Sequence, residues 1–452
     1  LSEAAQATHG QVIGNDALFT SVGTDSRKLA AGQLFVALRG EHFDGHAYAT
    51  TALEQGAAGV MVSSDVPALS AGVVVKDTRL ALGDLAAYWR RKFDIPLAAI
   101  TGSNGKTTVK EMLASILRTE AGADELVLAT EGNLNNDIGL PLTLLKLRDQ
   151  HRYAVAEMGM NHRGEIRYLT RIGAPTVALV NNGGTAHIGE LGSVEAIAQA
   201  KGEIFEGLSE GGVAVINADD AYAPFWHSLA APHKVATFGL EQPADVTATY
   251  RLESDHSAVA LRTPIGEVTF DLPSPGLHNV RNALAATTVA MAMGASLAAV
   301  AAGLARFSSA KGCLQPKAGL HQATVIDDTY NANPASMKAA IDVLAANAGK
   351  QILVLGDMGE LGQDAARMHA EVGTYAKEQG IDALLALGEL STHMVRTFGA
   401  GARHFDSPEA LAGVLSEMMD QDTVVLVKGS RFMKMERVVA LVTQGTTPGE
   451  NH

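Results

Sequence analysis

The chain has 452 residues, of which 47% are apolar, 19% charged and 5% aromatic. This apolar content can build several cores, which excludes a mainly disordered chain, and at roughly 150 residues per domain the length predicts about three domains. The net charge of −14 argues against a general binder of nucleic acid or of anionic membranes, because such proteins carry excess positive charge. A local basic pocket for phosphates is still compatible with this charge. The single cysteine, Cys313, excludes an internal disulfide and a cysteine-based metal site, so we expect a reducing cytoplasm.

The first 80 residues have an irregular pattern, with short apolar runs at Leu34–Leu38 and Val73–Val75. From about residue 81 the pattern changes to strand, loop and helix. Leu97–Ile100 reads as a buried strand, and after a glycine-rich turn the residues Thr107–Arg118 form one apolar stripe at helical spacing. Further runs typical of buried parallel strands are Ala154–Glu157, Val177–Val180 and Val213–Ile216.

The second half of the chain repeats this alternation after an interruption. Residues 246–272 alternate in a way that predicts an antiparallel insertion. The charge-free run from Ala283 to Ala305 is long enough for a membrane span, but it is mostly alanine and is interrupted at Gly294. With Ser296 as an N-cap, two short buried helices are the better interpretation, and we expect no membrane span.

A second series of predicted strands with helices between them comprises Ala323–Ile326, Ile352–Leu355, Leu384–Leu387 and Val424–Val427. We therefore predict an α/β protein of three domains: a small N-terminal α/β domain (1–80), a central parallel-sheet domain with a phosphate loop (81–310), and a C-terminal Rossmann-like domain (311–452).

The strongest chemical signal is the run from Thr101 to Thr108, which reads Thr-Gly-Ser-Asn-Gly-Lys-Thr-Thr. Two glycines allow a tight turn whose N–H groups, together with the helix N-terminus, can bind one anion. Lys106 supplies a charge for the β- and γ-phosphates, and the Thr107 hydroxyl is placed to hold Mg²⁺. Ile100 stands where a Walker A motif has glycine, so the loop is a shortened variant. This loop is predicted to bind the phosphates of a nucleotide, with contacts from Gly102, Ser103, Asn104, Gly105, Lys106, Thr107 and Thr108.

Further along the chain, three single residues each have both a functional and a structural interpretation. Glu157 ends a buried strand, where it can hold Mg²⁺ or form an ordinary salt bridge. His187 follows another strand at the same sheet edge, but a lone loop histidine is more often simply solvated. Lys201 lies in a helix predicted to begin near Ser193 and on its own reads as a surface cation.

Other polar residues lie at the starts of helices and at the ends of strands. Asn279 and Asn282 share one face of a helix start, where amides can read an adenine edge or cap the helix. Polar, glycine-bearing loops follow three C-terminal strands at Asp327–Pro334, Gly356–Gly362 and Lys428–Arg431. Together they suggest one wall of a cleft, whereas each alone is explained by turn chemistry.

This combination of motifs resembles the Mur ligase family, the ATP-dependent amide-forming enzymes of peptidoglycan synthesis. The resemblance covers nearly the whole chain. It is carried by the phosphate loop together with Thr24–Arg27, Gly132–Gly139, Ala200–Glu203, His278-Asn279 with Asn282, Asp328–Pro334 and Gly356–Gly362.

The resemblance implies a ligase that uses ATP and Mg²⁺ to join UDP-N-acetylmuramoyl-tripeptide and D-alanyl-D-alanine through an acyl phosphate, acting as a cytoplasmic monomer. It implies that the N-terminal domain binds the UDP-sugar, the central domain binds ATP, and the C-terminal domain binds the amino substrate. The residues that it implies for catalysis are Lys106, Glu157, His187, Lys201 and Asp328, and those for metal binding are Thr107, Glu157, His187 and a carbamylated Lys201. The implied nucleotide contacts are Asn279, Asn282 and Asp328. The implied substrate contacts are Ser26, Arg27, Asn135, Asn136, Asp137 and Asn331.

One residue departs from the family pattern. The family has arginine about fifteen residues before the position of Asp328, and this chain has Cys313 there. A thiol cannot replace a guanidinium, so either Lys311 or Lys317 substitutes or activity is impaired. The alternatives are a sister ligase, folylpolyglutamate synthase, a nucleotide-hydrolysing switch and a non-catalytic scaffold. Thr24–Arg27 and Tyr330–Pro334 argue against folylpolyglutamate synthase.

Overall fold

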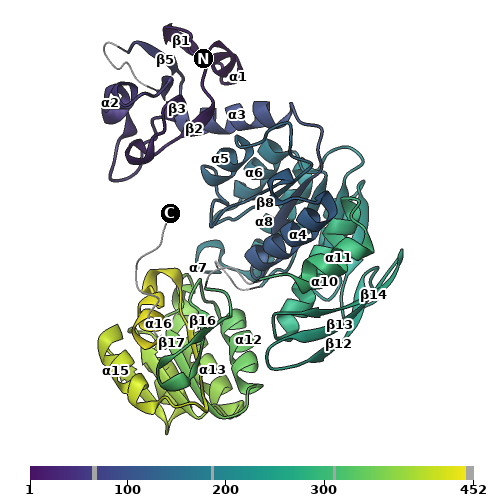
Figure 1. The fold of residues 1–452 in the computed structure, drawn as a ribbon, viewed down its shortest axis with the longest axis vertical. Helices are drawn as coiled ribbons and strands as arrows, with labels where there is room; N and C mark the ends of the chain where they lie inside the picture. Colours follow the sequence, from purple (N-terminus) through teal and green to yellow (C-terminus); the bar gives the residue numbers. More distant parts are fainter. Residues whose placement is uncertain (64–68, 185–187, 309–311, 444–452) are drawn as a thin grey trace.

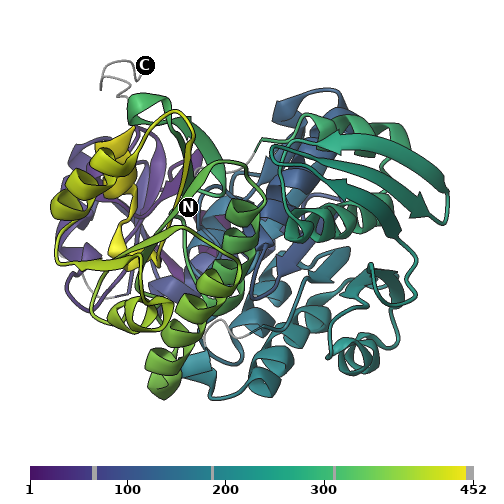
Figure 2. The ribbon, with the colours of Figure 1, turned by 90° about the horizontal axis from the view of Figure 1, so that it is seen from below.

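The computed structural model describes residues 1–63, 69–184, 188–308 and 312–443, and it confirms the α/β architecture. The described strands form four sheets, of which three are mainly parallel and one is antiparallel. Figure 1 shows the N-terminal body at the top, a central body with the antiparallel sheet beside it, and the C-terminal body below. Seen from below, the C-terminal body and the antiparallel sheet lie on opposite sides of the molecule (Figure 2).

The N-terminal body is built on a five-stranded sheet in the order β1-β5-β4-β3-β2, and β1 runs antiparallel to β5. Its elements are α1 (Ser2–Ala7), β1 (Gln11–Gly14), β2 (Ser21–Gly23), β3 (Gln33–Val36), α2 (Ala49–Glu54), β4 (Gly59–Val62) and β5 (Ala71–Val74). The predicted N-terminal α/β fold is therefore confirmed, although the irregular sequence pattern did not reveal its individual strands. Strands of three or four residues complete too few side-chain alternations to show a period in the sequence.

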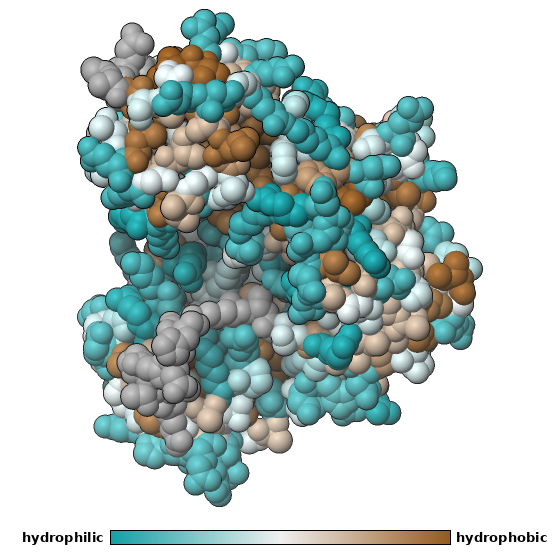
Figure 3. Space-filling view, turned by 45° about the horizontal axis from the view of Figure 1, so that its top comes forward, coloured by the Kyte–Doolittle hydropathy of each residue, from teal (hydrophilic) through white to brown (hydrophobic). Residues whose placement is uncertain are grey.

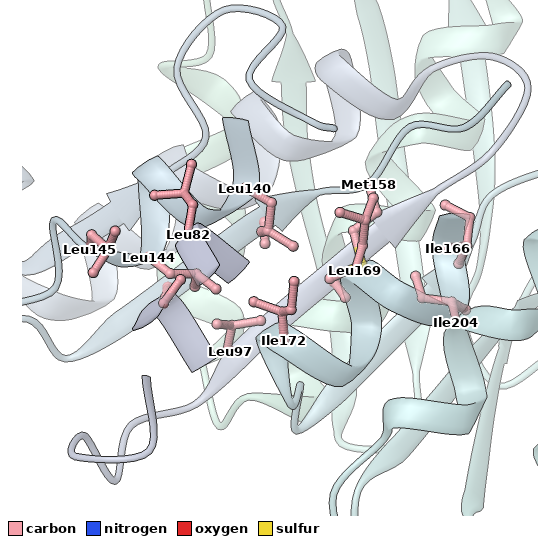
Figure 4. Packing of buried hydrophobic residues seen from close by; sticks show 14 of the residues in the cluster. Leu82, Leu97, Leu140, Leu144, Leu145, Met158, Ile166, Leu169, Ile172 and Ile204 are labelled. Carbon is pink, nitrogen blue, oxygen red and sulfur yellow. The ribbon is translucent and has the colours of Figure 1, made fainter. Parts of the chain in front are cut away.

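Helix α3 (Thr78–Arg90) joins this body to the central one and runs through residue 80. Its buried Leu82 lies near Leu140 and Leu144 of α5 (Gly139–Leu144), as Figure 4 shows. Residues of the N-terminal sheet and of the central sheet belong to this same apolar cluster. The two bodies therefore share one core.

The central body is built on a six-stranded parallel sheet in the order β11-β10-β9-β6-β8-β7. Its strands are β6 (Leu97–Thr101), β7 (Val127–Ala129), β8 (Tyr153–Glu157), β9 (Val177–Val180), β10 (Val213–Asn217) and β11 (Lys234–Phe238). Its further helices are α4 (Lys106–Ala121), α6 (Glu165–Gly173), α7 (Ile188–Leu191), α8 (Val194–Gly202) and α9 (Ala223–Ala230). The four strands predicted for this part of the sequence are confirmed.

The predicted antiparallel insertion is also confirmed, as β12 (Thr247–Leu252), β13 (Ser257–Thr263) and β14 (Gly266–Leu272). The alanine-rich run that follows belongs to two helices, α10 (Leu277–Ala292) and α11 (Leu297–Ala305). The Ser296 hydroxyl accepts the Ala299 N–H and caps α11, as predicted. Within the described residues, no helix is both long enough and apolar enough to span a bilayer.

The C-terminal body is built on a six-stranded sheet in the order β15-β16-β20-β17-β18-β19, in which β15 is antiparallel. Its strands are β15 (Gln315–Ala318), β16 (Thr324–Asp328), β17 (Lys350–Gly356), β18 (Ala383–Leu387), β19 (Ala402–Phe405) and β20 (Thr423–Lys428). Its helices are α12 (Pro334–Ala345), α13 (Ala365–Glu378), α14 (Thr392–Phe398), α15 (Pro408–Met418) and α16 (Glu436–Val442). The sequence predicted four of these strands and missed the short β15 and β19.

Candidate active site

A cavity of about 1200 Å³ lies between the central and C-terminal bodies. Its central side is formed by loops at the carboxyl ends of β6, β8 and β9, and its C-terminal side by loops that follow β16 and β20. This is the edge at which open α/β sheets bind their ligands. The space-filling view shows a hollow with many hydrophilic residues between the upper and lower parts of the molecule (Figure 3).

The predicted phosphate loop borders this cavity and leads directly into α4. Gly105 precedes the helix with a φ of 77°, and a Cβ there would lie 2.3 Å from the Asn282 Oδ1 atom. Only glycine therefore fits both the backbone and the space. No side chain caps the N-terminus of α4, so its first backbone N–H groups have no capping acceptor. An uncapped helix N-terminus of this kind binds anions.

Lys106 is the first residue of α4, and its ammonium group donates to the Gly102 carbonyl at 2.7 Å. Burial lowers the pKa of Lys106, while the negative charges of Glu157 and Glu360 oppose this shift. A phosphate bound at the helix start would add further negative charge beside the ammonium group. It would therefore favour the charged form of this lysine.

Thr107 and Glu157, both predicted to hold metal, are in direct contact. The Thr107 hydroxyl donates to Glu157 Oε2 at 2.9 Å, and Asn135 Nδ2 donates to Oε1 at 2.8 Å. Glu157 is 1% exposed, and its carboxylate accepts these two bonds in place of the salt bridge considered as the alternative. The described residues contain no group of three or more His, Cys, Asp or Glu side chains that could enclose a metal. A hydroxyl and a carboxylate beside a phosphate site do fit Mg²⁺, which usually keeps waters and phosphate oxygens as its other ligands.

Lys201 is 1% exposed, which rules out the surface cation considered for it. Helix α8 begins at Val194, directly after its N-cap Ser193 and where the sequence predicted a helix start, and it carries Lys201 near its end. Burial lowers the pKa of Lys201 well below its ordinary value, and the positive charge of Lys106 lowers it further. Both effects disfavour the charged ammonium form of Lys201. His187 lies outside the described residues.

Asn279 and Asn282 both line the cavity. Asn279 Nδ2 donates to Ser274 Oγ at 2.8 Å and to the Pro275 carbonyl at 2.9 Å. Neither amide caps α10, because its N-cap is Gly276 and no side chain bonds to the cap position. The capping alternative is therefore wrong.

On the C-terminal side, Asp328 ends β16 and forms an ion pair with Lys428 at 2.6 Å. Burial raises the pKa of Asp328, although Lys428 pulls it down. Asn331 lines the cavity close by, and its carbonyl accepts a bond from Lys428 Nζ at 2.9 Å. The loops after β16 and β20 thus form one wall, as the sequence suggests, whereas the third loop of that prediction, Gly356–Gly362, does not line this cavity.

Cys313 also lines the cavity. Burial raises the pKa of its thiol to about 12, so it is not a nucleophilic thiolate at neutral pH. Lys317, considered as a substitute for the missing arginine, forms an ion pair with Asp327 at 2.6 Å. Lys311 lies outside the described residues.

The predicted substrate residues do not all reach this cavity. Asn135 lines it, but Ser26, Arg27, Asn136 and Asp137 do not. Arg27 forms an exposed ion pair with Asp25 in the N-terminal body, and Asp137 forms one with Arg79. These four residues stay predictions of a separate substrate surface.

The sequence missed the amides that hold the phosphate loop in place. Asn181 Nδ2 and Asn182 Nδ2 donate to the Asn104 carbonyl at 3.0 and 3.1 Å, and Asn182 Oδ1 accepts the Asn104 N–H at 2.8 Å. The signal available was the pair of asparagines directly after a buried strand. Its role could not be assigned without knowing that β9 lies next to β6.

Comparison with known families and proteins supports one assignment. The model described as "Mur ligase family, catalytic domain" matches residues 18–90, "Mur ligase middle domain" matches 100–290, and "Mur ligase, glutamate ligase domain" matches 314–431. The chain is 44% identical to the UDP-N-acetylmuramoyl-tripeptide–D-alanyl-D-alanine ligase of Escherichia coli (strain K12), over 99% of both chains.

Solved structures agree with this similarity. A crystal structure of MurF from Acinetobacter baumannii has a TM-score of 0.92 and 38% identity, and covers 97% of both chains. MurF ligase from Thermotoga maritima in complex with ADP has a TM-score of 0.85 and 26% identity, with 94% of this chain and 98% of that chain covered. Together with the phosphate-loop geometry, these similarities show that the chain belongs to the Mur ligase family.

Proposed function

We propose that this chain is an ATP-dependent ligase that joins D-alanyl-D-alanine to UDP-N-acetylmuramoyl-tripeptide. The product is the UDP-muramoyl-pentapeptide precursor of peptidoglycan. The observation that carries the proposal is the uncapped start of α4, with Lys106 and the Thr107–Glu157 pair, at a cavity shared with the C-terminal body. The activity named for the Escherichia coli relative supports it over the whole length of the chain.

The reaction has two steps. A carboxylate oxygen of the tripeptide attacks the γ-phosphorus of ATP, the bond from that phosphorus to the bridging oxygen breaks, and ADP leaves. The amine of the dipeptide then attacks the carbonyl carbon of the acyl phosphate, loses a proton, and phosphate departs as the amide forms. Negative charge gathers on phosphate oxygens in both steps, so positioned cations and N–H groups are the main sources of rate.

We assign the phosphate-binding role to the loop from Gly102 to Thr108. The N–H groups at the start of α4 and the Lys106 ammonium would orient the triphosphate and stabilise charge on the γ-phosphate. Thr107 and Glu157 would hold Mg²⁺, with His187 and Lys201 serving a second ion, and the metal would supply positive charge at the phosphates. A neutral buried Lys201 is the form that can capture CO₂ as a carbamate and offer oxygen ligands.

The remaining roles follow the three predicted domains. We propose that residues 1–80 bind the UDP-sugar with Ser26 and Arg27, helped by Asn135, Asn136 and Asp137. Residues 81–310 would bind ATP, with Asn279 and Asn282 at the nucleoside. Residues 311–452 would bind the dipeptide, with Asp328 reaching the nucleotide and Asn331 the substrate. We propose that one chain forms the complete site and that the enzyme works as a cytoplasmic monomer.

The test is ADP formation measured with each cosubstrate alone and with both together. The ligase requires the UDP-tripeptide and the dipeptide, whereas a nucleotide-hydrolysing switch releases ADP without them. Replacing UDP-tripeptide by other UDP-muramoyl peptides distinguishes the sister ligases. ADP formation that is indifferent to both cosubstrates would refute the proposal.

The variant Lys106→Ala should lower turnover by about a hundredfold or more, because it removes a charged donor at the reacting phosphate. Its circular dichroism spectrum and melting temperature should stay close to those of the parent protein. Lys234→Ala, which changes an exposed lysine at the start of β11, is the matched control and should keep full turnover. Near-normal activity in Lys106→Ala would remove the assignment of the loop.

A further inference from the structure

Asn104 touches the C-terminal body with its side chain, while its backbone is fully engaged elsewhere. Its N–H and carbonyl groups bond to Asn181 and Asn182 of the central body. Its side-chain oxygen accepts a hydrogen bond of 2.5 Å from Asn333 Nδ2, across 229 residues of sequence. The Asn104 N–H is thus not available to a phosphate, whereas no side chain caps the N–H groups that start α4. The Asn104 side chain therefore serves a contact between bodies rather than a phosphate.

Asn333 is well suited to make this contact, because its other atoms are fixed. It is the N-cap of α12: its Oδ1 accepts the Ser336 N–H at 3.0 Å, and its own N–H donates to Ser336 Oγ at 3.0 Å. The capping box uses the side-chain oxygen and leaves the Nδ2 donor for Asn104. The position of α12 is thereby tied directly to the phosphate loop.

Three residues earlier, Tyr330 lines the cavity together with Thr107. The C-terminal body thus contacts the phosphate loop through Asn333 at Asn104.

The segment that carries Asn333 is hydrogen-bonded to the far wall of the cavity. The Tyr330 N–H donates to the Gly312 carbonyl at 2.9 Å, and Ser430 Oγ donates to the Ala332 carbonyl at 3.1 Å. Lys428 bridges Asp328 and the Asn331 carbonyl. A shift of the segment would therefore also move the wall that carries Asp328 and Lys428.

We propose that Asn333 is a positioning residue that docks the C-terminal body on the phosphate loop, so that Asp328 and Lys428 face the bound nucleotide. This inference rests on the proposed ligase function. It concerns the alignment of the two cavity walls, whereas nucleotide binding itself is assigned to the start of α4. Losing the contact between Asn333 and Asn104 should therefore impair use of the amine substrate while the loop still binds nucleotide.

The test uses Asn333→Ser, because serine keeps a good N-cap for α12 but is too short to reach Asn104. For this variant the dissociation constant of Mg·ADP should stay within about twofold of the parent value, by calorimetric titration. The KM for D-alanyl-D-alanine should rise about three- to tenfold, the size expected for one lost hydrogen bond.

A matched control separates this outcome from general damage. Asp77→Ser exchanges the cap of α3 in the same way and should leave the dipeptide KM unchanged. An unchanged dipeptide KM in Asn333→Ser would overturn the inference, as would an equal rise in the Mg·ADP dissociation constant. A parent protein that forms no ADP with both cosubstrates would instead overturn the proposed function.

Discussion

The carboxyl group of Asp328 is largely buried, and its ionisation depends on its ion pair with Lys428. Burial raises its pKa, and the charge and hydrogen bond of Lys428 oppose that rise. The two side chains are 12% and 5% exposed and lie 2.6 Å apart. Removing one partner of such a pair leaves the other buried and unpaired, which costs about 3–5 kcal/mol.

Lys428→Met should therefore destabilise the protein in a pH-dependent way. Without Lys428 the folded-state pKa of Asp328 rises further above its unfolded value, so the folded protein holds a proton that the unfolded chain releases. Stability then falls as the pH rises through this interval. The loss of melting temperature, measured by scanning calorimetry, should be larger at pH 8 than at pH 5.

Lys317→Met is the matched control for this prediction. Lys317 also pairs with an aspartate at 2.6 Å, but its side chain is 35% exposed, so water can replace it as a partner. Its effect on the melting temperature should be smaller. Equal losses at pH 5 and pH 8 in Lys428→Met would contradict the argument.

At the scale of single residues, the sequence located those chemical groups that follow a strand or open a helix. Lys106, Thr107 and Glu157 were found in this way, and the structure joins Thr107 to Glu157. The bond between Asn333 and Asn104 could not be found, because nothing local in either segment refers to the other. The burial of Lys201 was hidden for the same reason: the elements that cover it lie elsewhere in the chain.

At the scale of elements, α4 offers a comparison between its two ends. Gly105 precedes the helix and Gly122 ends it, with φ values of 77° and 87°. A Cβ at Gly105 would meet Asn282 Oδ1 and Asn181 Nδ2, whereas at Gly122 nothing lies within 4 Å. Alanine at either position would adopt a left-handed backbone conformation, which destabilises the folded protein by about 1–2 kcal/mol.

Gly105→Ala should weaken Mg·ADP binding at least tenfold, because the new methyl group also displaces the amides that shape the phosphate loop. Gly122→Ala should cost similar backbone strain and leave nucleotide affinity unchanged. Calorimetric titration of both variants measures the difference. Equal affinities would show that the space around Gly105 plays no part in binding.

The predicted elements are most reliable where a long period shows in the sequence. The stripe from Thr107 to Arg118 became α4, and the buried runs of the two parallel sheets became strands within one or two residues. The sequence did not predict the strands of the N-terminal sheet, because they are three or four residues long and are stabilised by their neighbours across the sheet. Such strands are defined by tertiary packing more than by their own residues.

At the scale of the whole molecule, the apolar cores fall into two groups. One cluster combines residues of the N-terminal sheet, α3 and the central sheet, whereas two other clusters cover the faces of the C-terminal sheet. Because cooperative unfolding follows shared cores, scanning calorimetry should show two transitions. Mg·ADP at a hundredfold excess over its dissociation constant should stabilise the transition that contains the phosphate loop by about 2.7 kcal/mol. A single two-state transition would contradict this division.

The strand order of the central sheet has a consequence for how the protein is made. β6 lies in the middle of the sheet, yet its partners β9 and β8 and the helix that carries Asn282 are all translated after it. A nascent chain leaving the ribosome therefore exposes both unpaired edges of this apolar strand until β8 has been synthesised, and one edge until β9 follows. Such edges attract other strands, so this stretch of translation is where the young protein most needs shielding by chaperones.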